Sequence, residues 1–315
     1  MSAEQGPDDV KVSGLFSYPV KGCRAVEHAA AGLLTSGLRN DREWMLVDCR
    51  RSPAQFLSQR ELPAMATIAA EVRVQDGAEV LVLSAPGQGP LVVSMPQELQ
   101  RIEVRVWNHE TQAMDAGDAA AEWCARVTGF GVGQVRLVRF DASLRRDCNR
   151  VYAGESGAHT FFADGYPVLV ASESSLADLN QRMGRTEGNL LPMNRFRPNI
   201  VLSGLPAWDE DHIDTIGIGS ATLRLVKPCV RCQVTTTDQH SGARLSEEPL
   251  VTLGRFRNNP DLGGVTFGWN AVVEGVGTIR TGASCVVMTG LPEVFFPDLP
   301  GRLLMVLKAG LGPAA

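Results

Sequence analysis

The sequence predicts an α+β protein that is predominantly β, and three observations support this fold class. Short segments in which apolar and polar residues partly alternate recur along the first half, separated by Gly, Pro, Asp and Ser. Patterns typical of helices are few. The 315 residues, 44% hydrophobic and 21% charged, have the composition of an ordinary globular protein of one large or two smaller domains. Such chains fold as sheet-rich domains or barrels.

The alternating segments give the predicted strands in order. In the first half they span residues 10–20, 43–48, 66–74, 79–85, 90–95 and 101–107. In the second half they span residues 199–203, 221–226, 271–274 and 285–288.

A first helix is predicted over residues 119–127, with Asp118 as its N-cap and Gly129 at its end. This helix and its glycine-rich exit mark the division between two lobes. We therefore expect an N-terminal β-rich domain at 8–125, a second domain at 126–290 and a tail at 291–315.

A second helix is predicted over residues 172–183, where Leu176, Leu179 and Met183 form one apolar stripe and Gly184 follows. A short amphipathic pattern at residues 302–308 predicts a further helix in the tail.

Charge, cysteine usage and apolar run length exclude several classes of protein. A net charge of -5 and a pI near 5.6 argue against a nucleic-acid polymer as partner, which requires a concentrated basic face. Seven scattered cysteines do not form a disulfide pattern, and thiols of this kind suit the cytosol. No run is long enough for a membrane span, and no signal-peptide pattern is present. We expect a cytoplasmic protein without a membrane partner.

The densest group of polar residues is KPCVRCQVTTTD, residues 227–238. Cys229 and Cys232 stand three apart with Lys227 and Arg231 beside them, and neighbouring cations favour the thiolate that binds soft metals. Half a zinc site, a redox pair and plain buried cysteines are the competing interpretations. A second CxxC is absent, and thioredoxin-type pairs begin a helix, whereas a Thr-rich strand is expected here.

Other motifs supply candidate anion-binding residues. Arg197, in NRFRPNIV, precedes a predicted strand, where a planar guanidinium can bind phosphate through two hydrogen bonds. Lys21, in YPVKGC, and Arg42, in LRNDREW, could also contact an anion. Ordinary surface ion pairs or solvated loops are the alternatives. The GFGVG stretch at 129–133 is predicted to be a loop, and Glu247 and Glu248 a solvated turn.

Taken in order, seven segments resemble the two-part MOSC architecture of the mitochondrial amidoxime-reducing component and its bacterial relatives. The resemblance runs from about Lys11 to about Val287. It rests on YPVKGC, LRNDREW, ASESSLADLN, FRPNIVLSG, WDED, KPCVRCQVTTTD and TFGWN. It implies a β-rich N-terminal MOSC lobe and a MOSC β-barrel lobe with a few helices, with the cofactor in the cleft between them.

The resemblance also implies residue roles. Cys232 would be the catalytic residue and the ligand of molybdenum in a molybdopterin cofactor. The implied cofactor-binding residues are Lys21, Arg42, Asp164, Arg197, Asn199 and Arg231. Converging cations suit the phosphate of molybdopterin, and one thiolate would complete a sulfur ligand set with its dithiolene. Gly22 and Val230 replace serines of the animal enzymes, which removes two hydroxyl groups near the cofactor.

The resemblance therefore implies a molybdenum-dependent reductase of small N-hydroxylated compounds: amidoximes, hydroxylamines or N-hydroxylated base analogues. No cysteine pattern for an iron–sulfur cluster follows Met288, so electrons are expected from a separate protein, a flavin reductase with a haem or iron–sulfur carrier. A molybdenum-cofactor carrier or sulfur-transfer module is the alternative function. A redox or zinc protein without molybdenum is a third hypothesis.

Overall fold

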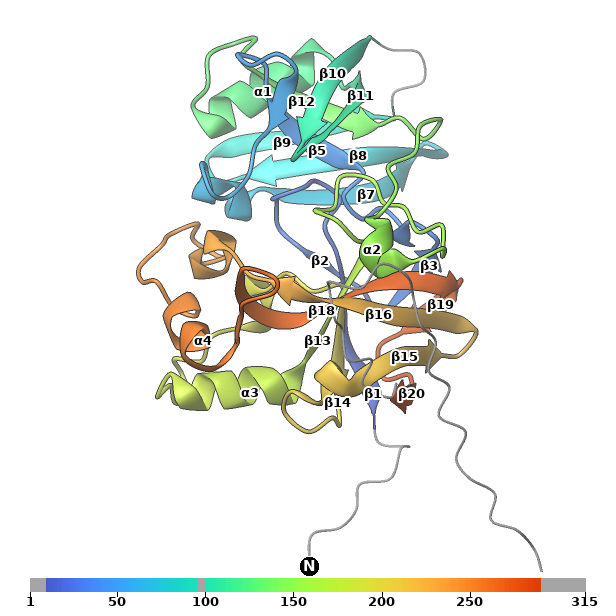
Figure 1. The fold of residues 1–315 in the computed structure, drawn as a ribbon. Coiled ribbons are helices and arrows are strands. Elements are labelled where there is room, and N and C mark those ends of the chain that lie inside the picture. The colour runs from blue at the N-terminus through green and yellow to red at the C-terminus, as the bar shows by residue number, and fades with distance from the viewer. Residues whose placement is uncertain (1–9, 96–99, 290–315) are drawn as a thin grey trace, which may run out of the picture.

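The computed structural model describes residues 10–95 and 100–289 as strands joined by loops, with few helices (Figure 1). This confirms the predicted α+β, mainly β class. Among these residues, none of the helices has the length and apolar character needed to cross a bilayer. The helix predicted at 302–308 and the tail at 291–315 lie outside the described residues.

The strands up to residue 140 are β1 (Lys11–Ser17), β2 (Val26–Glu27), β3 (Ala30–Leu34), β4 (Gly37–Leu38), β5 (Trp44–Asp48), β6 (Ala54–Phe56), β7 (Ala69–Gln75), β8 (Ala78–Ala85), β9 (Gln88–Ser94), β10 (Arg101–Val106), β11 (His109–Asp115) and β12 (Val135–Phe140). Those that follow are β13 (Val168–Ser172), β14 (Ile200–Ser203), β15 (Ile213–Ile218), β16 (Ala221–Val230), β17 (Asn258–Asn259), β18 (Gly264–Gly275), β19 (Gly277–Arg280) and β20 (Val286–Thr289).

The α-helices are α1 (Asp118–Thr128), α2 (Arg150–Ala153), α3 (Glu173–Arg182) and α4 (Leu250–Phe256). Short 3-10 turns are η2 (Pro63–Thr67), η3 (Met193–Arg195), η4 (Asp209–His212) and η5 (Gln233–Thr236).

The two predicted long helices are present with small corrections at their starts. Asp118 is the first residue of α1 and Gly117 is its N-cap, so the predicted cap was wrong by one position. Gly129 ends α1 in the left-handed conformation that the sequence predicted. Ser172 is the N-cap of α3 but makes no capping hydrogen bond with its side chain.

The turn at Glu247 and Glu248 is only partly as predicted. Glu247 is exposed, whereas the Glu248 carboxylate accepts hydrogen bonds from the backbone N–H and hydroxyl of Thr252 at 3.1 and 3.0 Å. Glu248 therefore binds the first turn of α4 in the manner of a helix cap. The GFGVG stretch is a loop, as predicted.

The sheets combine strands from both ends of the chain. A nine-stranded sheet has the order β2-β1-β14-β13-β18-β16-β15-β20, with β17 paired to β18. A closed barrel runs β10-β11-β12-β5-β6, and β7-β8-β9 and β19-β3-β4 form three-stranded sheets. In Figure 1, β1 runs among the later strands in the lower part of the molecule. The predicted boundaries at 8–125 and 126–290 stay a prediction.

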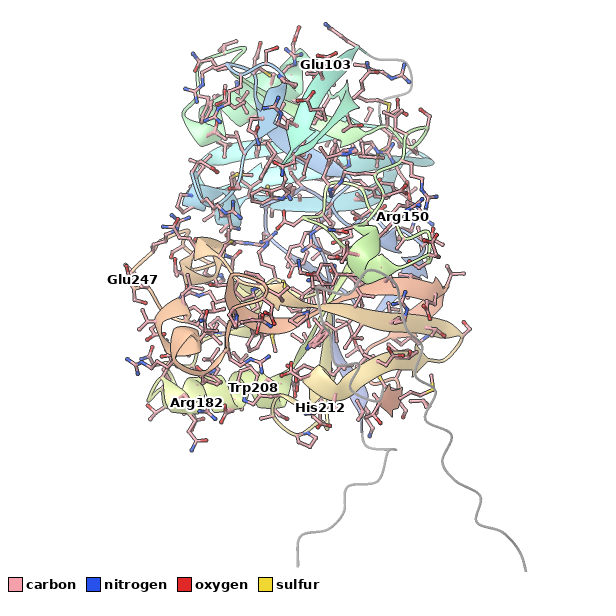
Figure 2. The ribbon with its side chains drawn as sticks, viewed as in Figure 1. Glu103, Arg150, Arg182, Trp208, His212 and Glu247 are labelled. Carbon is pink, nitrogen blue, oxygen red and sulfur yellow. The ribbon has the colours of Figure 1, made fainter. Side chains whose placement is uncertain are left out.

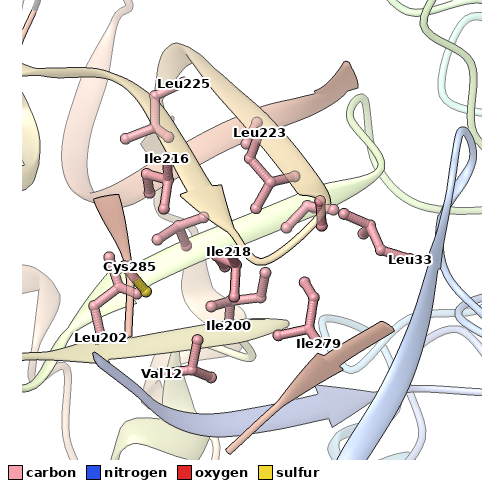
Figure 3. Close-up of a cluster of buried hydrophobic side chains, with 14 of the residues drawn as sticks. Val12, Leu33, Ile200, Leu202, Ile216, Ile218, Leu223, Leu225, Ile279 and Cys285 are labelled. Carbon is pink, nitrogen blue, oxygen red and sulfur yellow. The ribbon is translucent and has the colours of Figure 1, made fainter. Parts of the chain in front are cut away.

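The main core lies beneath the nine-stranded sheet, where aliphatic side chains from early and late strands meet (Figure 3). Val12 of β1, Leu33 of β3, Ile200 of β14 and Ile279 of β19 are at most 1% exposed within it. Burial of such side chains is the principal stabilising contribution. The core therefore fixes the loops that follow β1, precede β14 and leave β16.

Candidate functional site

The loop after β1 places Lys21 inside the protein. Its backbone N–H donates to the carbonyl of Trp44 at 2.8 Å. Its ammonium donates to the carbonyl of Phe162 at 2.8 Å and forms an ion pair with Asp164. Lys21 is 7% exposed, and this burial lowers its pKa despite the opposing effect of Asp164.

Arg42 lies between β4 and β5 with a backbone φ of 50°, in the left-handed region that few non-glycine residues occupy. Its guanidinium donates to the Asp41 carboxylate at 2.6 Å and to the Asn199 side-chain oxygen at 3.1 Å. The other Asp41 oxygen accepts from the backbone N–H of Tyr18 at 2.8 Å. Asp41 therefore joins this arginine to the loop that carries Lys21.

Arg197 also has a left-handed backbone, with φ of 56°, and its guanidinium is 4.2 Å from the centre of the Tyr18 ring. The Arg42 guanidinium lies at the same distance from that ring. The Tyr18 hydroxyl donates to the Pro198 carbonyl at 3.0 Å, and burial raises the pKa of Tyr18 to about 12. One neutral phenol thus contacts both arginine side chains.

Asn199 is 1% exposed and uses both ends of its amide. Its oxygen accepts from Arg42 and from the backbone N–H of Leu169, and its nitrogen donates to the Phe16 carbonyl, each at 3.1 Å. These bonds connect β1 and β13 with Arg42. We infer that Asn199 positions the site from within the protein.

Cys232 follows β16 and is the N-cap residue of the 3-10 turn η5, so the Thr-rich strand expected after the two cysteines was wrong. Its carbonyl accepts hydrogen bonds from the backbone N–H and the hydroxyl of Thr235, both at 3.0 Å. The residue is partly exposed, and its sulfur makes no hydrogen bond to any part of the chain that the structure describes. The thiol is therefore unpaired within the described residues.

The cation predicted beside the two cysteines contacts the first of them. Arg231 donates to the Cys229 sulfur at 2.8 Å and to the Phe196 carbonyl at 2.6 Å. The second bond places Arg231 next to Phe196, the residue before Arg197. Cys229 thus has a partner within the chain.

Asp164 lies beside Lys21 at the protein surface. Its carboxylate is 72% exposed and accepts from the Trp107 indole at 3.1 Å. Desolvation by the surrounding protein raises the pKa of Asp164, but the Lys21 ammonium more than offsets this, and the net pKa is lowered. The Trp107 ring in turn contacts the Arg60 guanidinium at 4.3 Å.

A pair of buried glutamines lies between Arg197 and the segment that follows η5. Gln59 and Gln239 exchange two hydrogen bonds of 3.0 and 2.8 Å, and the Gln239 oxygen accepts from Arg197 at 3.0 Å. The sequence analysis missed both residues, together with Trp107. It also missed Tyr18 and Asp41, although these stand inside YPVKGC and LRNDREW.

The structure thus brings most of the predicted residues together. Lys21 pairs with Asp164, and Arg42 contacts both Asn199 and the backbone of Arg197. Arg231 reaches this group through the Phe196 carbonyl, and Cys232 is the next residue in the sequence. The structure gives no direct contact between Cys232 and the other candidate side chains in the described ranges.

The charges of this group suit an anionic cofactor. Four cations, Lys21, Arg42, Arg197 and Arg231, gather here with two carboxylates, Asp41 and Asp164. Arg197 forms no ion pair within residues 10–95 and 100–289, and the buried Nε of Arg231 has no hydrogen-bond partner there. An unpaired buried cation is costly unless an anion reaches it. A phosphate-bearing cofactor therefore fits these residues.

Among the described residues, no cluster of three or more His, Cys, Asp or Glu side chains is arranged to hold a metal ion.

Comparison with protein families identifies the class. The model of the MOSC N-terminal beta barrel domain matches residues 9–130, and the model of the MOSC domain matches residues 158–286. The chain belongs to the MOSC-domain family.

Its relatives include two kinds of named protein. It is 32% identical over 288 residues to mitochondrial amidoxime reducing component 2 of Bos taurus, covering 86% of this chain and 81% of the relative. Identity to mitochondrial amidoxime-reducing component 1 of Homo sapiens is also 32%, with the same two shares covered. The chain is 29% identical to a molybdenum cofactor sulfurase of Oryza sativa subsp. japonica, over 87% of this chain and 34% of that protein.

Proposed function

We propose that this protein has a molybdenum-cofactor-related function, and specifically that it reduces N-hydroxylated compounds with Cys232 as the protein ligand of the metal. One observation carries the proposal: a partly exposed thiol without a partner among the described residues is next in sequence to Arg231. The bond from Arg231 to the Phe196 carbonyl joins this loop to a group of cations that includes the buried Lys21 and Arg197. A thiolate suits the metal of a molybdopterin cofactor, and clustered cations suit its phosphate.

The cations would hold the phosphate end of the cofactor. Arg197 supplies a buried guanidinium that no carboxylate of the described chain neutralises. Lys21 and Arg42 are each paired with one carboxylate, so they would add hydrogen-bond donors and fix the surrounding loops. The unpaired Nε of Arg231 is a further donor for an acceptor atom of the pterin.

Cys232 would bind the metal through its thiolate. The two bonds from Thr235 to the Cys232 carbonyl fix the backbone that carries the sulfur, so the ligand would be held before the metal arrives. When bound, the molybdenum cofactor supplies the electrons that reductive cleavage of an N–O bond needs. The chain itself would orient the substrate and limit the access of water.

The choice of substrate rests on the relatives. Two relatives that are 32% identical over 86% of this chain are named as amidoxime-reducing components. We therefore propose amidoximes and related small N-hydroxylated compounds, and a separate electron-transfer protein as donor. The cytoplasmic location expected from the sequence stays a prediction.

The second candidate is a molybdenum-cofactor carrier or sulfur-transfer module. The similarity to a molybdenum cofactor sulfurase over 87% of this chain favours it. Such a protein would bind the cofactor through the same cations but would not turn over an N-hydroxylated substrate.

The test compares three proteins expressed in a host that makes plain molybdopterin: the parent, Cys232→Ser and Cys229→Ser. Molybdenum is measured by plasma mass spectrometry, and benzamidoxime reduction is measured with reduced methyl viologen as electron donor. We expect near-stoichiometric metal and activity in the parent and in Cys229→Ser, and loss of both in Cys232→Ser.

Each alternative has its own result. Metal without reduction in the parent would favour the carrier. A folded parent that holds no molybdenum would contradict the whole metalloenzyme proposal.

A further inference from the structure

The buried amides of Gln59 and Gln239 form a directed chain of hydrogen bonds. The Gln59 nitrogen donates to the Gly22 carbonyl at 2.7 Å and to the Gln239 oxygen at 3.0 Å. The Gln239 nitrogen donates to the Gln59 oxygen at 2.8 Å and to the Thr237 carbonyl at 3.1 Å. The two side chains are 180 residues apart in the sequence and are 1% and 7% exposed.

These bonds fix which way the Gln239 amide points. Its nitrogen is held by two acceptors, so its oxygen faces Arg197, from which it accepts at 3.0 Å. The Gln59 amide is itself oriented by Gly22, the neighbour of Lys21. The orientation of the Arg197 guanidinium is therefore set from the loop that carries Lys21.

The acceptor that holds Arg197 carries no charge. Lys21 and Arg42, the neighbouring cations, are each held by a carboxylate that cancels much of their field. A glutamate would bind a guanidinium more strongly than glutamine does, because a charged acceptor strengthens the hydrogen bond. A neutral amide oxygen fixes the side chain and leaves its positive charge available.

We propose that Gln239 is a positioning residue that holds Arg197 ready for a phosphate group without neutralising it, and that Gln59 sets the direction of the Gln239 amide. This rests on the proposed function only in naming the phosphate as that of the cofactor. The Thr237 carbonyl lies one residue beyond η5, so the same amide connects the anion site with the segment that begins at Cys232.

The test uses inorganic phosphate as the probe and isothermal calorimetry on the cofactor-free full-length protein. Gln239→Glu places a carboxylate against Arg197, whereas Gln239→Met keeps the side-chain length and removes the acceptor without adding charge. Gln181→Glu, on the exposed face of α3, is the control for the added negative charge. Thermal unfolding of every variant is measured alongside.

We expect Gln239→Glu to weaken phosphate binding about tenfold or more, because the new charge competes at contact distance. Gln239→Met should weaken it about threefold, since the guanidinium stays charged but loses its fixed direction. Gln181→Glu should bind like the parent. Molybdenum content after expression with plain molybdopterin should fall in the same order.

A purely structural role for Gln239 predicts a different pattern, in which binding follows unfolding temperature whatever the charge of the substitute. The proposal is overturned if Gln239→Glu binds phosphate as well as Gln239→Met does, or if the parent binds none. Should Gln239→Glu fail to fold, Gln239→Met and Gln59→Met decide, and parent-like binding in both would contradict the proposal. Phosphate binding by a parent that never retains molybdenum would reject the proposed reductase and leave this inference intact.

Discussion

The guanidinium of Arg42 donates a hydrogen bond to the backbone carbonyl of Arg197 at 3.3 Å. Both residues have positive φ angles, and a non-glycine residue in such a conformation costs about 1–3 kcal/mol. Strain of this size persists only where the surroundings fix it. Here Asp41, Asn199 and the Tyr18 ring contact the Arg42 side chain and hold the two arginines in one arrangement.

Removal of the Tyr18 ring should destabilise this arrangement more than removal of its hydroxyl. Tyr18→Phe loses the bond to the Pro198 carbonyl and should cost about 1 kcal/mol of unfolding free energy. Tyr18→Leu also loses the ring beside both arginines and should cost about 3 kcal/mol or more. Urea unfolding measures both values, and equal costs would contradict the role assigned to the ring.

Asn199→Ala should reduce both stability and cofactor retention. It leaves Arg42, the Leu169 N–H and the Phe16 carbonyl without their buried partner, at a cost of about 2–4 kcal/mol. Asn180→Ala is a matched control, because within residues 10–95 and 100–289 its side-chain amide binds the backbone of Leu191 and no cation. Molybdenum per folded protein should fall in the first variant and not in the second. A parallel fall in both would mean a general folding defect.

Stability should fall as pH rises through the range in which Glu210 titrates. This side chain is 1% exposed, and desolvation raises its pKa from 4.5 to about 7 although Ser175 donates to it at 2.7 Å. A carboxyl whose pKa is higher in the folded state stabilises it fully below pH 4.5, and this contribution disappears as pH rises to about 7. Figure 2 shows Trp208, two residues before Glu210, beside α3, where its indole donates to the Asp178 carboxylate at 2.7 Å.

The magnitude follows from the same pKa values. Each pKa unit corresponds to about 1.4 kcal/mol. The free energy of unfolding should therefore fall by about 3 kcal/mol between pH 4.5 and pH 7. Glu210→Gln should remove this part of the pH dependence and be more stable than the parent at pH 8. Urea unfolding at pH 5 and pH 8 gives the comparison, and identical pH profiles for the two proteins would reject the prediction.

Gly268, in the TFGWN segment of β18, should not tolerate a side chain. Its φ is 69°, and an added Cβ would lie 2.6 Å from the Val170 carbonyl oxygen. Gly77 has a φ of 80°, but a Cβ added there would have no atom within 4 Å. Gly77→Ala therefore measures the cost of the left-handed backbone conformation alone. We expect the free energy of unfolding to fall by about 1 kcal/mol in Gly77→Ala and by about 3 kcal/mol or more in Gly268→Ala. Equal losses in thermal unfolding would show that the close approach to Val170 has no cost.

Local pattern predicted the fold class, two of the helices and ten of the twenty strands that the structure describes. Alternating residues predicted β5, β8 and β10, and the glycine after α1 predicted the end of that helix. The polar sequence HETQAMD of β11 gave no comparable signal. It is a strand because it pairs with β10 and β12 in a closed barrel, and pairing of this kind is a tertiary effect.

Some residues of the candidate site could also be predicted from the sequence, and others could not. Cys232, Lys21 and Arg197 were predictable because their residue types stand in motifs with a clear chemical role. Gln59 and Gln239 were not, because an amide has no distinctive pattern and their contact joins positions far apart in sequence. Arg231 was predicted beside a cysteine pair, but only the structure shows that Cys229 is the thiol it contacts.

The pairing of β1 with β14 has a consequence for synthesis of the chain. Lys11 pairs with Ser203, so the first strand emerges from the ribosome nearly two hundred residues before its neighbour. At about 5–20 residues per second, that wait lasts roughly 10–40 s. During it the apolar strand KVSGLFS has a free edge that can pair with other nascent chains. Slower translation before residue 200 should therefore favour aggregation, and a chaperone bound to the first strand should oppose it.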